Sequence, residues 1–218
     1  MSSIEFFNNK NYVVVKNYLS ADICRLFYNY IKIKAQAVDF KMTYSPEKYD
    51  LEWDGTFNKD PQAPGDFSCY ADTLMETLLA QTTPIINETT GLDVYPQYSY
   101  FRLYQKDTEL VKHKDRPECE ISTTLCLGWD ISNLDYEYVW PFYINDEKIN
   151  LNPGDMVIYK GCDVEHHREP FLGLNHAQVF LHYHDKKGPY YNGMYDNRPL
   201  LGVSKKTFFP KFEVKAIC

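Results

Sequence analysis

Two short stretches of the sequence carry residue types that can bind a metal ion. The first is His113-Lys114-Asp115, and the second, far along the chain, is His166-His167. Residues two apart on an extended segment point to the same side, so the His113 imidazole and the Asp115 carboxylate can converge on one point. Two histidines and one carboxylate on one face of a ferrous ion leave positions open for a co-substrate and for dioxygen. The pattern predicts an iron(II) site built from His113, Asp115 and one later histidine.

A His-x-Asp pair is short enough to arise by chance, and a histidine near a strand end is more often a surface or core residue than a ligand. Context favours the site. The pair opens a region rich in strand-forming residues, and several predicted strands separate it from the second stretch. Tyr104 also lies close before His113. A metal site is therefore the preferred interpretation.

The N-terminal part of the sequence predicts a strand and two helices that position this site. Tyr12–Val15 is a short β-branched strand. Ser20 is a candidate N-cap for an amphipathic helix over Ala21–Gln36, where apolar residues recur at helical spacing. A second helix is expected from about Cys69 to Gln81.

Two features interrupt the helical pattern in this part of the chain. Pro84 breaks the second helix, which we expect to resume over residues 85–90 and to end at Gly91, a natural C-cap residue. Residues 38–66 are rich in turn-forming residues and poorly periodic. A loop of this length is either a surface excursion or a lid over a binding site, and both interpretations stay open.

From Gln97 onward the sequence predicts β-strands. Gln97–Gln105 alternates, with Tyr98, Tyr100, Arg102 and Tyr104 on one face and Ser99, Phe101 and Leu103 on the other. The other expected strands are Glu120–Leu127, Val139–Ile144, Lys148–Leu151, Met156–Lys160, Val164–Pro170 and Ala177–His184. Helices followed by a run of strands indicate an α+β fold. We expect one domain over residues 1–218: strand, helices and lid-like loop in 1–95, a core with the metal site in 96–185, and an irregular tail in 186–218.

Composition excludes several classes of protein. The net charge of −7 and the lack of a basic run argue against a nucleic-acid partner. No apolar run is long enough to span a membrane, and the N-terminus lacks the apolar core of a signal peptide. The six cysteines show no C-x-x-C spacing, so we expect reduced thiols in a cytoplasmic protein. The oligomeric state is not indicated by the sequence.

Several of these motifs together resemble the iron(II)/2-oxoglutarate oxygenases of the prolyl 4-hydroxylase type. The resemblance runs from about Tyr12 to Tyr183, and includes Tyr104, His113-x-Asp115, Pro153-Gly-Asp155 and His166-x-x-x-Pro170. It implies a double-stranded β-helix, that is, a jelly-roll or cupin-like core flanked by two or more N-terminal helices.

The resemblance also implies roles for particular residues. His113, Asp115 and His166 would hold Fe(II), and His166 is preferred over His167 because the family places a proline four residues after this ligand, where Pro170 stands. Tyr104 corresponds to a tyrosine that lines the pocket for 2-oxoglutarate. The implied cofactors are Fe(II) and the co-substrate 2-oxoglutarate, with ascorbate as an accessory reductant.

The sequence departs from the family pattern at the anchor for the distal carboxylate of 2-oxoglutarate. The family has Lys or Arg about ten residues after the third ligand, whereas position 176 is His. A carboxylate in a water-poor pocket needs a charged partner, and a bidentate arginine suits it best. Arg102, Arg168 and a protonated His176 are the three candidates, in that order. The alternating segment His176–Tyr183 should turn its even-numbered residues into the barrel and its odd-numbered residues toward the helices.

The resulting expectation is a dioxygenase that hydroxylates a C–H bond of a peptidyl or free amino acid, acting on a small-molecule or peptide substrate. One alternative is a non-catalytic β-roll that binds a metal or a small ligand, since a fold alone does not determine function. Another is a zinc-dependent hydrolase or cupin isomerase that uses the same three residues together with His182 or His184.

Overall fold

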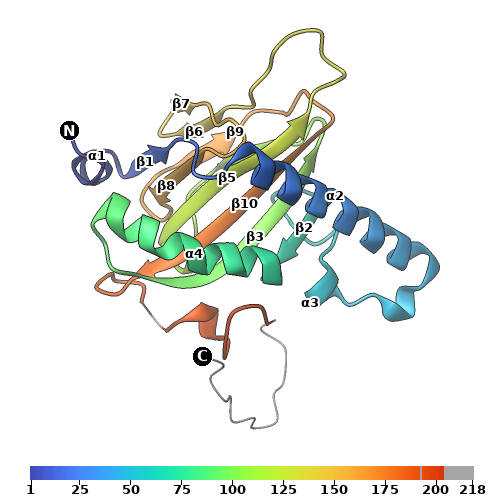
Figure 1. The fold of residues 1–218 in the computed structure, drawn as a ribbon, viewed down its shortest axis with the longest axis horizontal. Coiled ribbons are helices and arrows are strands. Elements are labelled where there is room, and N and C mark those ends of the chain that lie inside the picture. The colour runs from blue at the N-terminus through green and yellow to red at the C-terminus, as the bar shows by residue number, and fades with distance from the viewer. Residues whose placement is uncertain (192, 204–218) are drawn as a thin grey trace.

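The core of the protein is a pair of antiparallel β-sheets that face each other (Figure 1). This computed structural model describes residues 1–191 and 193–203. The larger sheet has the strand order β1-β8-β5-β10-β3-β2 and the smaller has the order β4-β9-β6-β7. The strands are β1 Tyr12–Val15, β2 Phe67–Tyr70, β3 Val94–Gln105, β4 Leu110–His113, β5 Ile121–Asp130, β6 Phe142–Ile144, β7 Glu147–Ile149, β8 Met156–Lys160, β9 His166–Arg168 and β10 Asn175–Asp185.

Two long helices, α2 (Ala21–Tyr44) and α4 (Thr73–Thr90), cover the outer face of the larger sheet (Figure 1). Side chains from one stripe of each helix pack against odd-numbered residues of β10 in one apolar cluster. Ser20 and Asp72 cap the two N-termini with their side-chain oxygens, and Gly91 ends α4 in the left-handed conformation. The remaining helices are short: α1 Ser3–Lys10, α3 Leu51–Asp54, and the 3₁₀ turns η1 Pro46–Lys48, η2 Pro117–Cys119 and η3 Tyr195–Asn197.

The alternation expected in the neighbouring strands β3 and β10 is confirmed. Phe101 and Leu103 of β3 lie in the helix-facing cluster together with Ala177, Val179, Leu181 and Tyr183 of β10. Tyr98, Tyr100, Arg102, Phe180 and His182 lie on the opposite face and line the cavity between the sheets. Because side chains alternate along a strand, one face of this strand pair packs against the helices and the other lines the cavity.

Four details of the N-terminal half differ from the sequence predictions. The second helix does not begin at Cys69, which lies in β2, because Asp72 accepts hydrogen bonds from the first helical N–H groups and fixes the start at Thr73. Pro84 lies inside α4 without ending it. Helix α2 continues to Tyr44, so the segment 38–66 begins as helix. The helix α1 was not predicted, although its Ser2–Glu5 capping box is visible in the sequence.

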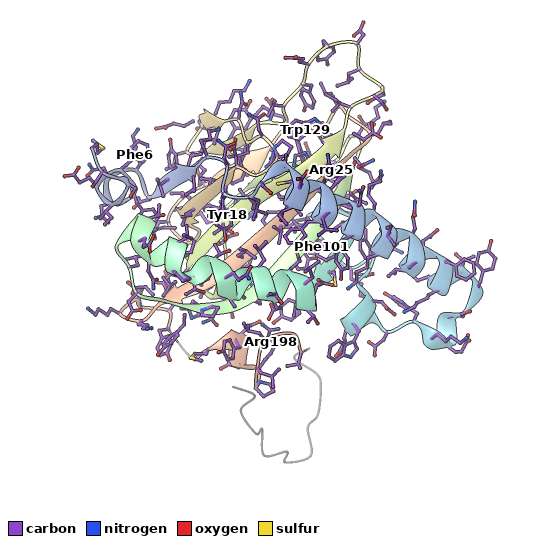
Figure 2. The ribbon with its side chains drawn as sticks, in the orientation of Figure 1. Phe6, Tyr18, Arg25, Phe101, Trp129 and Arg198 are labelled. Carbon is purple, nitrogen blue, oxygen red and sulfur yellow. The ribbon has the colours of Figure 1, made fainter. Side chains whose placement is uncertain are left out.

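The chain after β10 runs beneath α4, where the labelled Arg198 lies (Figure 2). Its guanidinium donates to Glu76 of α4 at 2.9 Å and to the backbone oxygen of Gln97 at 2.7 Å. The predicted irregular tail is thus tied to the core through Arg198 and Gly202. Residues 192 and 204–218 of this tail, including Pro210 and Cys218, lie outside the described residues. Within the described ranges, none of the helices is long and apolar enough to cross a bilayer. The five described cysteines are free thiols.

Candidate metal centre

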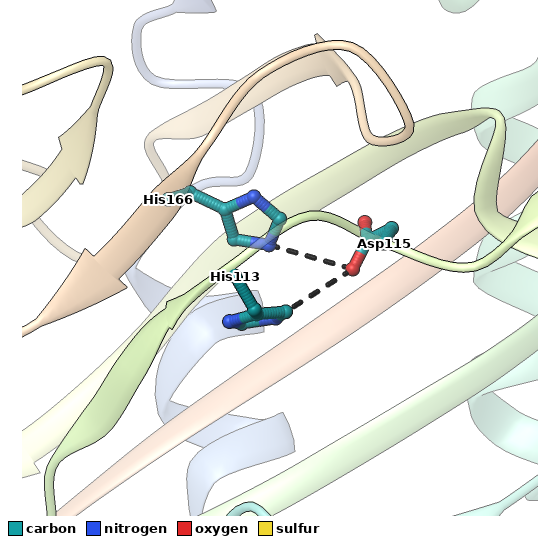
Figure 3. Close-up of side chains that lie close together, drawn as sticks. All are labelled: His113, Asp115 and His166. Carbon is teal, nitrogen blue, oxygen red and sulfur yellow. Dashed lines mark ion pairs between the residues drawn. The ribbon is translucent and has the colours of Figure 1, made fainter.

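His113, Asp115 and His166 converge at one end of the smaller sheet (Figure 3). One possible ligand atom from each residue lies within 4.8 Å of the other two. Asp115 Oδ1 is 3.8 Å from His113 Nε2 and 3.4 Å from His166 Nε2. The sequence prediction that these three residues meet in space therefore agrees with their positions.

Strand pairing brings the two histidines together. β4 and β9 are antiparallel neighbours, and His113 pairs directly with His166 in this ladder. Residues directly opposite each other on one face have neighbouring side chains, and the two imidazole centroids are 4.3 Å apart. The register shifts between Leu110 and His113. Irregularities of this kind commonly re-aim a side chain next to an active site.

Hydrogen bonds to the backbone orient both imidazoles. His113 Nδ1 lies 2.7 Å from the carbonyl oxygen of Val111, and His166 Nδ1 lies 3.2 Å from that of Val164. A carbonyl can only accept, so each Nδ1 carries the proton and donates it. In a neutral ring, Nε2 is then the nitrogen with a free lone pair, and the Nε2 atoms of both histidines lie toward Asp115. This is the arrangement by which outer groups fix the tautomer of a metal-binding histidine.

Ser122 and Gly161 hold the Asp115 carboxylate in place. The Ser122 hydroxyl donates to Asp115 Oδ2 at 2.9 Å, which leaves Oδ1 toward the histidines. The Asp115 N–H donates to the Gly161 carbonyl at 2.9 Å. A Cβ atom at Gly161 would collide with Asp115 Oδ2 and with the carbonyl oxygen of Cys119, so only glycine fits here. Neither Ser122 nor Gly161 was predicted as a site residue.

The pKa values of Asp115 and His113 are both lowered by their surroundings. Burial disfavours ionisation of Asp115, but the hydrogen bond and charge of His166, with contributions from His182 and Ser122, outweigh it and lower the pKa of Asp115 to about 2. Burial, followed by the neighbouring His166, lowers the pKa of His113. At neutral pH the site thus holds a carboxylate with a neutral His113 beside it, which is the protonation state that metal binding needs.

A cavity of about 440 Å³ opens onto the three residues. This volume lies within the range of small-molecule binding sites. Its wall is largely aromatic, formed by Tyr70, Tyr98, Tyr100, Phe142, Tyr159 and Phe180. Lys59, Asp60, Pro61 and Gln62 from the 38–66 segment line the same cavity. Part of the segment that the sequence left open as lid or surface excursion therefore forms one wall of the site.

Arg102 lines this cavity but is already paired. Its Nε donates to Asp60 Oδ2 at 2.5 Å and its Nη2 to Asp60 Oδ1 at 3.0 Å, and it also donates to Gln62 and to the Tyr104 hydroxyl. Both partners of the ion pair are nearly fully buried. The charge of Arg102 is thus compensated within the chain itself.

Arg168 is buried without an acidic partner among the described residues. Its Nη1 donates to the carbonyl oxygen of Trp140 at 2.8 Å, and its guanidinium lies 4.5 Å from the centre of the Trp140 ring and 5.2 Å from that of Phe142. Burial lowers the pKa of Arg168. Since Phe142 lines the cavity, the guanidinium stands directly behind the cavity wall.

The other predicted residues take different positions. Burial, and then the charge of Arg168, lowers the pKa of His176 to about 3, so this residue is neutral and is not a cation for a carboxylate. Tyr104 is fully buried beside Trp140 and Arg102 rather than on the cavity surface. His167 stacks on Tyr143 and is not part of the three-residue cluster.

No protein-family model matches this sequence, and no curated protein matches it either. Solved structures share its fold. An oxidoreductase of the 2OG-Fe(II) oxygenase family from Burkholderia pseudomallei has a TM-score of 0.59 and 11% identity, over 89% of this chain and 91% of its own. A prolyl-4-hydroxylase from Pseudomonas putida has a TM-score of 0.53 and 15% identity, over 85% and 98%. HygX from Streptomyces hygroscopicus, with nickel and 2-oxoglutarate bound, has a TM-score of 0.58 and 10% identity, over 87% and 89%. The predicted α+β jelly-roll fold, and the resemblance at the level of fold, are confirmed.

Proposed function

We propose that this protein is an iron(II)- and 2-oxoglutarate-dependent dioxygenase. The observation that carries the proposal is the oriented set of His113, Asp115 and His166 at the base of a cavity. Two imidazole Nε2 atoms and one carboxylate oxygen face a common point, and the lowered pKa values of Asp115 and His113 suit a divalent cation. This donor set is the one used by non-haem iron(II) oxygenases. The similar HygX structure holds nickel and 2-oxoglutarate, which supports a divalent metal ion together with 2-oxoglutarate here.

Bound iron would supply the activation of dioxygen and the oxidative decarboxylation of 2-oxoglutarate to succinate. The residues of the chain do the positioning. Ser122 keeps one oxygen of Asp115 occupied, so the other is directed to the metal. Tyr98, Tyr100 and Phe180 form an apolar wall that excludes water from the reacting groups.

Arg168 is the anchor that the geometry supports best for the distal carboxylate of 2-oxoglutarate. A buried guanidinium without a counter-ion is unfavourable, so a ligand carboxylate that pairs with it removes a destabilising charge. Arg102, the first candidate from the sequence, would have to release Asp60 before binding a second carboxylate. The neutral His176 offers no charge.

The direct test is Fe(II)-dependent conversion of 2-oxoglutarate to succinate by the full chain. We expect His113→Ala, Asp115→Ala and His166→Ala to abolish it, while His167→Ala retains it. Turnover that persists in the first three variants would sink the assignment. Loss of turnover and of metal in His167→Ala alone would instead make His167 the third ligand.

We further propose that the reaction is hydroxylation of a C–H bond in a peptidyl or free amino acid. The similarity to the Pseudomonas putida prolyl-4-hydroxylase supports this reaction class. The second candidate function, a non-catalytic β-roll that binds a metal or a small ligand, is favoured by the internal pairing of Arg102 with Asp60. Titration with 2-oxoglutarate separates the two, because metal binding without any affinity for the oxo acid would indicate the non-catalytic protein.

A further inference from the structure

The mouth of the cavity carries an excess of positive charge. Lys59 comes from the 38–66 segment, whereas Lys114 and Arg116 flank Asp115 in the chain, and all three are exposed and line the cavity. Among the described residues, neither lysine takes part in an ion pair. Arg116 makes one long contact of 3.7 Å with Glu118. This concentration of cations stands out in a chain whose net charge is −7.

The acidic residues that line the cavity are already matched by other positive charges, so they do not pair with Lys59 or Lys114. Among the residues that the structure describes, the acidic ones that line it are Asp60 and Asp115. Asp60 is neutralised by Arg102. In the proposed enzyme, the two positive charges of iron and that of Arg168 balance Asp115 and the two carboxylates of 2-oxoglutarate. The three cations at the mouth, Lys59, Lys114 and Arg116, can therefore bind a further anion. A cleft lined by one sign of charge attracts ligands of the opposite sign.

The wall below the rim is aromatic. Arg116 donates to the Tyr98 hydroxyl at 3.1 Å and its guanidinium lies 5.5 Å from the centre of the Tyr98 ring. Tyr70 packs on Tyr98 with ring centroids 5.0 Å apart. A ligand bound here meets cations at the entrance and apolar ring faces further in.

We infer that the substrate of this site is a small organic acid, whose carboxylate is held by Lys59, Lys114 and Arg116 and whose apolar body lies against Tyr70 and Tyr98. This inference rests on the proposed function and names its substrate class. The size of the cavity fits a small molecule beside 2-oxoglutarate. A free amino acid meets this description through its carboxylate.

The test uses the full chain loaded with Mn(II) and saturated with 2-oxoglutarate, so that the co-substrate site is filled. 3-Phenylpropionate and its neutral amide are titrated by calorimetry. A charge-assisted contact predicts that the acid binds about ten-fold more tightly than the amide. The double variant Lys59→Gln/Lys114→Gln should lose most of this preference. Lys112→Gln is the matched control, because Lys112 pairs with Asp146 and does not line the cavity.

Each outcome has a defined meaning. Equal affinity for acid and amide, failure of both to bind, or an acid preference that survives in the double variant would overturn the inference. Binding of 2-oxoglutarate is measured first in the same cell. If 2-oxoglutarate does not bind, the proposed function fails; if it binds and the acid does not, only the substrate class fails.

Discussion

Asp60 and Arg102 form a buried ion pair with two contacts, Nε to Oδ2 at 2.5 Å and Nη2 to Oδ1 at 3.0 Å. The pair joins a loop of the 38–66 segment to strand β3. It also receives a hydrogen bond from the Tyr100 hydroxyl, at 2.9 Å from Asp60. The contacts connect the 38–66 segment to one wall of the cavity, and under the proposed function they leave Arg102 less available to 2-oxoglutarate.

The pair makes Asp60→Asn a sharp test of these roles. Removing one partner of a buried ion pair leaves an uncompensated charge and costs about 3–5 kcal/mol of stability. We expect a clear fall in the free energy of unfolding by urea, with the affinity for 2-oxoglutarate retained because the proposed anchor is Arg168 rather than Arg102. Asp22→Asn serves as the control, since its pair with Arg25 is exposed. A marked change in 2-oxoglutarate affinity would indicate that Arg102, rather than Arg168, binds the distal carboxylate.

Arg168→Met should weaken the binding of 2-oxoglutarate and have a smaller effect on stability than Asp60→Asn. Met removes a buried charge that has no acidic partner in the described chain, so the ligand-free protein should lose less stability than with Asp60→Asn. Its affinity for 2-oxoglutarate should fall by about ten-fold or more, because a charged hydrogen bond to a carboxylate is lost. Thermal shifts on addition of 2-oxoglutarate to the Mn(II) protein measure this. Mn(II) affinity itself should stay unchanged, and a wild-type response to 2-oxoglutarate would contradict the assignment.

Gly161→Ala should weaken metal binding. The added methyl group would meet the backbone oxygen of Cys119 and also Asp115 Oδ2 and Cβ, the last at 2.9 Å, and would push the carboxylate from its position. Loss of a supporting contact typically weakens metal binding about 10–100-fold. Competition titration with a chelator measures the change. Gly65→Ala is the control. The φ of +88° at this position strains an alanine backbone, but the added Cβ would meet no atom within 4 Å. Equal metal affinity in both variants would refute the role of Gly161.

The free energy of unfolding should depend on pH through the titration of Asp66. Burial raises the pKa of Asp66 to about 6 from 3.8, against the hydrogen bonds from Thr108 and Gln105, and its Oδ2 has no hydrogen-bond partner among the described residues. The folded state therefore favours the protonated form, whose contribution is complete below pH 4 and lost as the pH rises through 6. The shift corresponds to at most about 3 kcal/mol.

The variant Asp66→Asn cannot ionise, so its stability relative to the wild type should rise between pH 4 and pH 7. Urea unfolding of both proteins at the two pH values gives the comparison. Asp39→Asn, an exposed residue of α2, should show no such trend. A difference between Asp66→Asn and wild type that does not vary with pH would be inconsistent with a raised pKa.

The sequence predicted the parts of the site that depend on local periodicity. Strand alternation placed Tyr98, Tyr100 and Arg102 on the cavity face, and the i, i+2 spacing brought His113 toward Asp115. Contacts between distant segments were not predictable in this way. Asp60 meets Arg102 across 42 positions, and no local pattern marks either residue for the other.

The errors in the fold have a similar origin. The segment Cys69–Gln81 has helical apolar spacing, but pairing with β3 makes Cys69 part of a strand, and the Asp72 side chain starts the helix later. Gly161 was not predicted as a site residue, because the atoms that exclude a side chain there belong to Cys119 and Asp115, which are distant in the sequence. Tertiary contacts, rather than propensity, decided both positions.

The central position of β10 has a consequence for how the molecule assembles. β10 lies between β5 and β3 in the larger sheet, yet it is the last strand in the described chain. Until residues 175–185 have left the ribosome, β3 and β5 each present an unpaired edge, and exposed edges favour wrong pairing. Completion of the sheet joins segments that are distant in the sequence, and such topologies fold slowly compared with helical bundles. The nascent chain thus carries all three candidate metal-binding residues before it carries the strand that closes the sheet around their cavity.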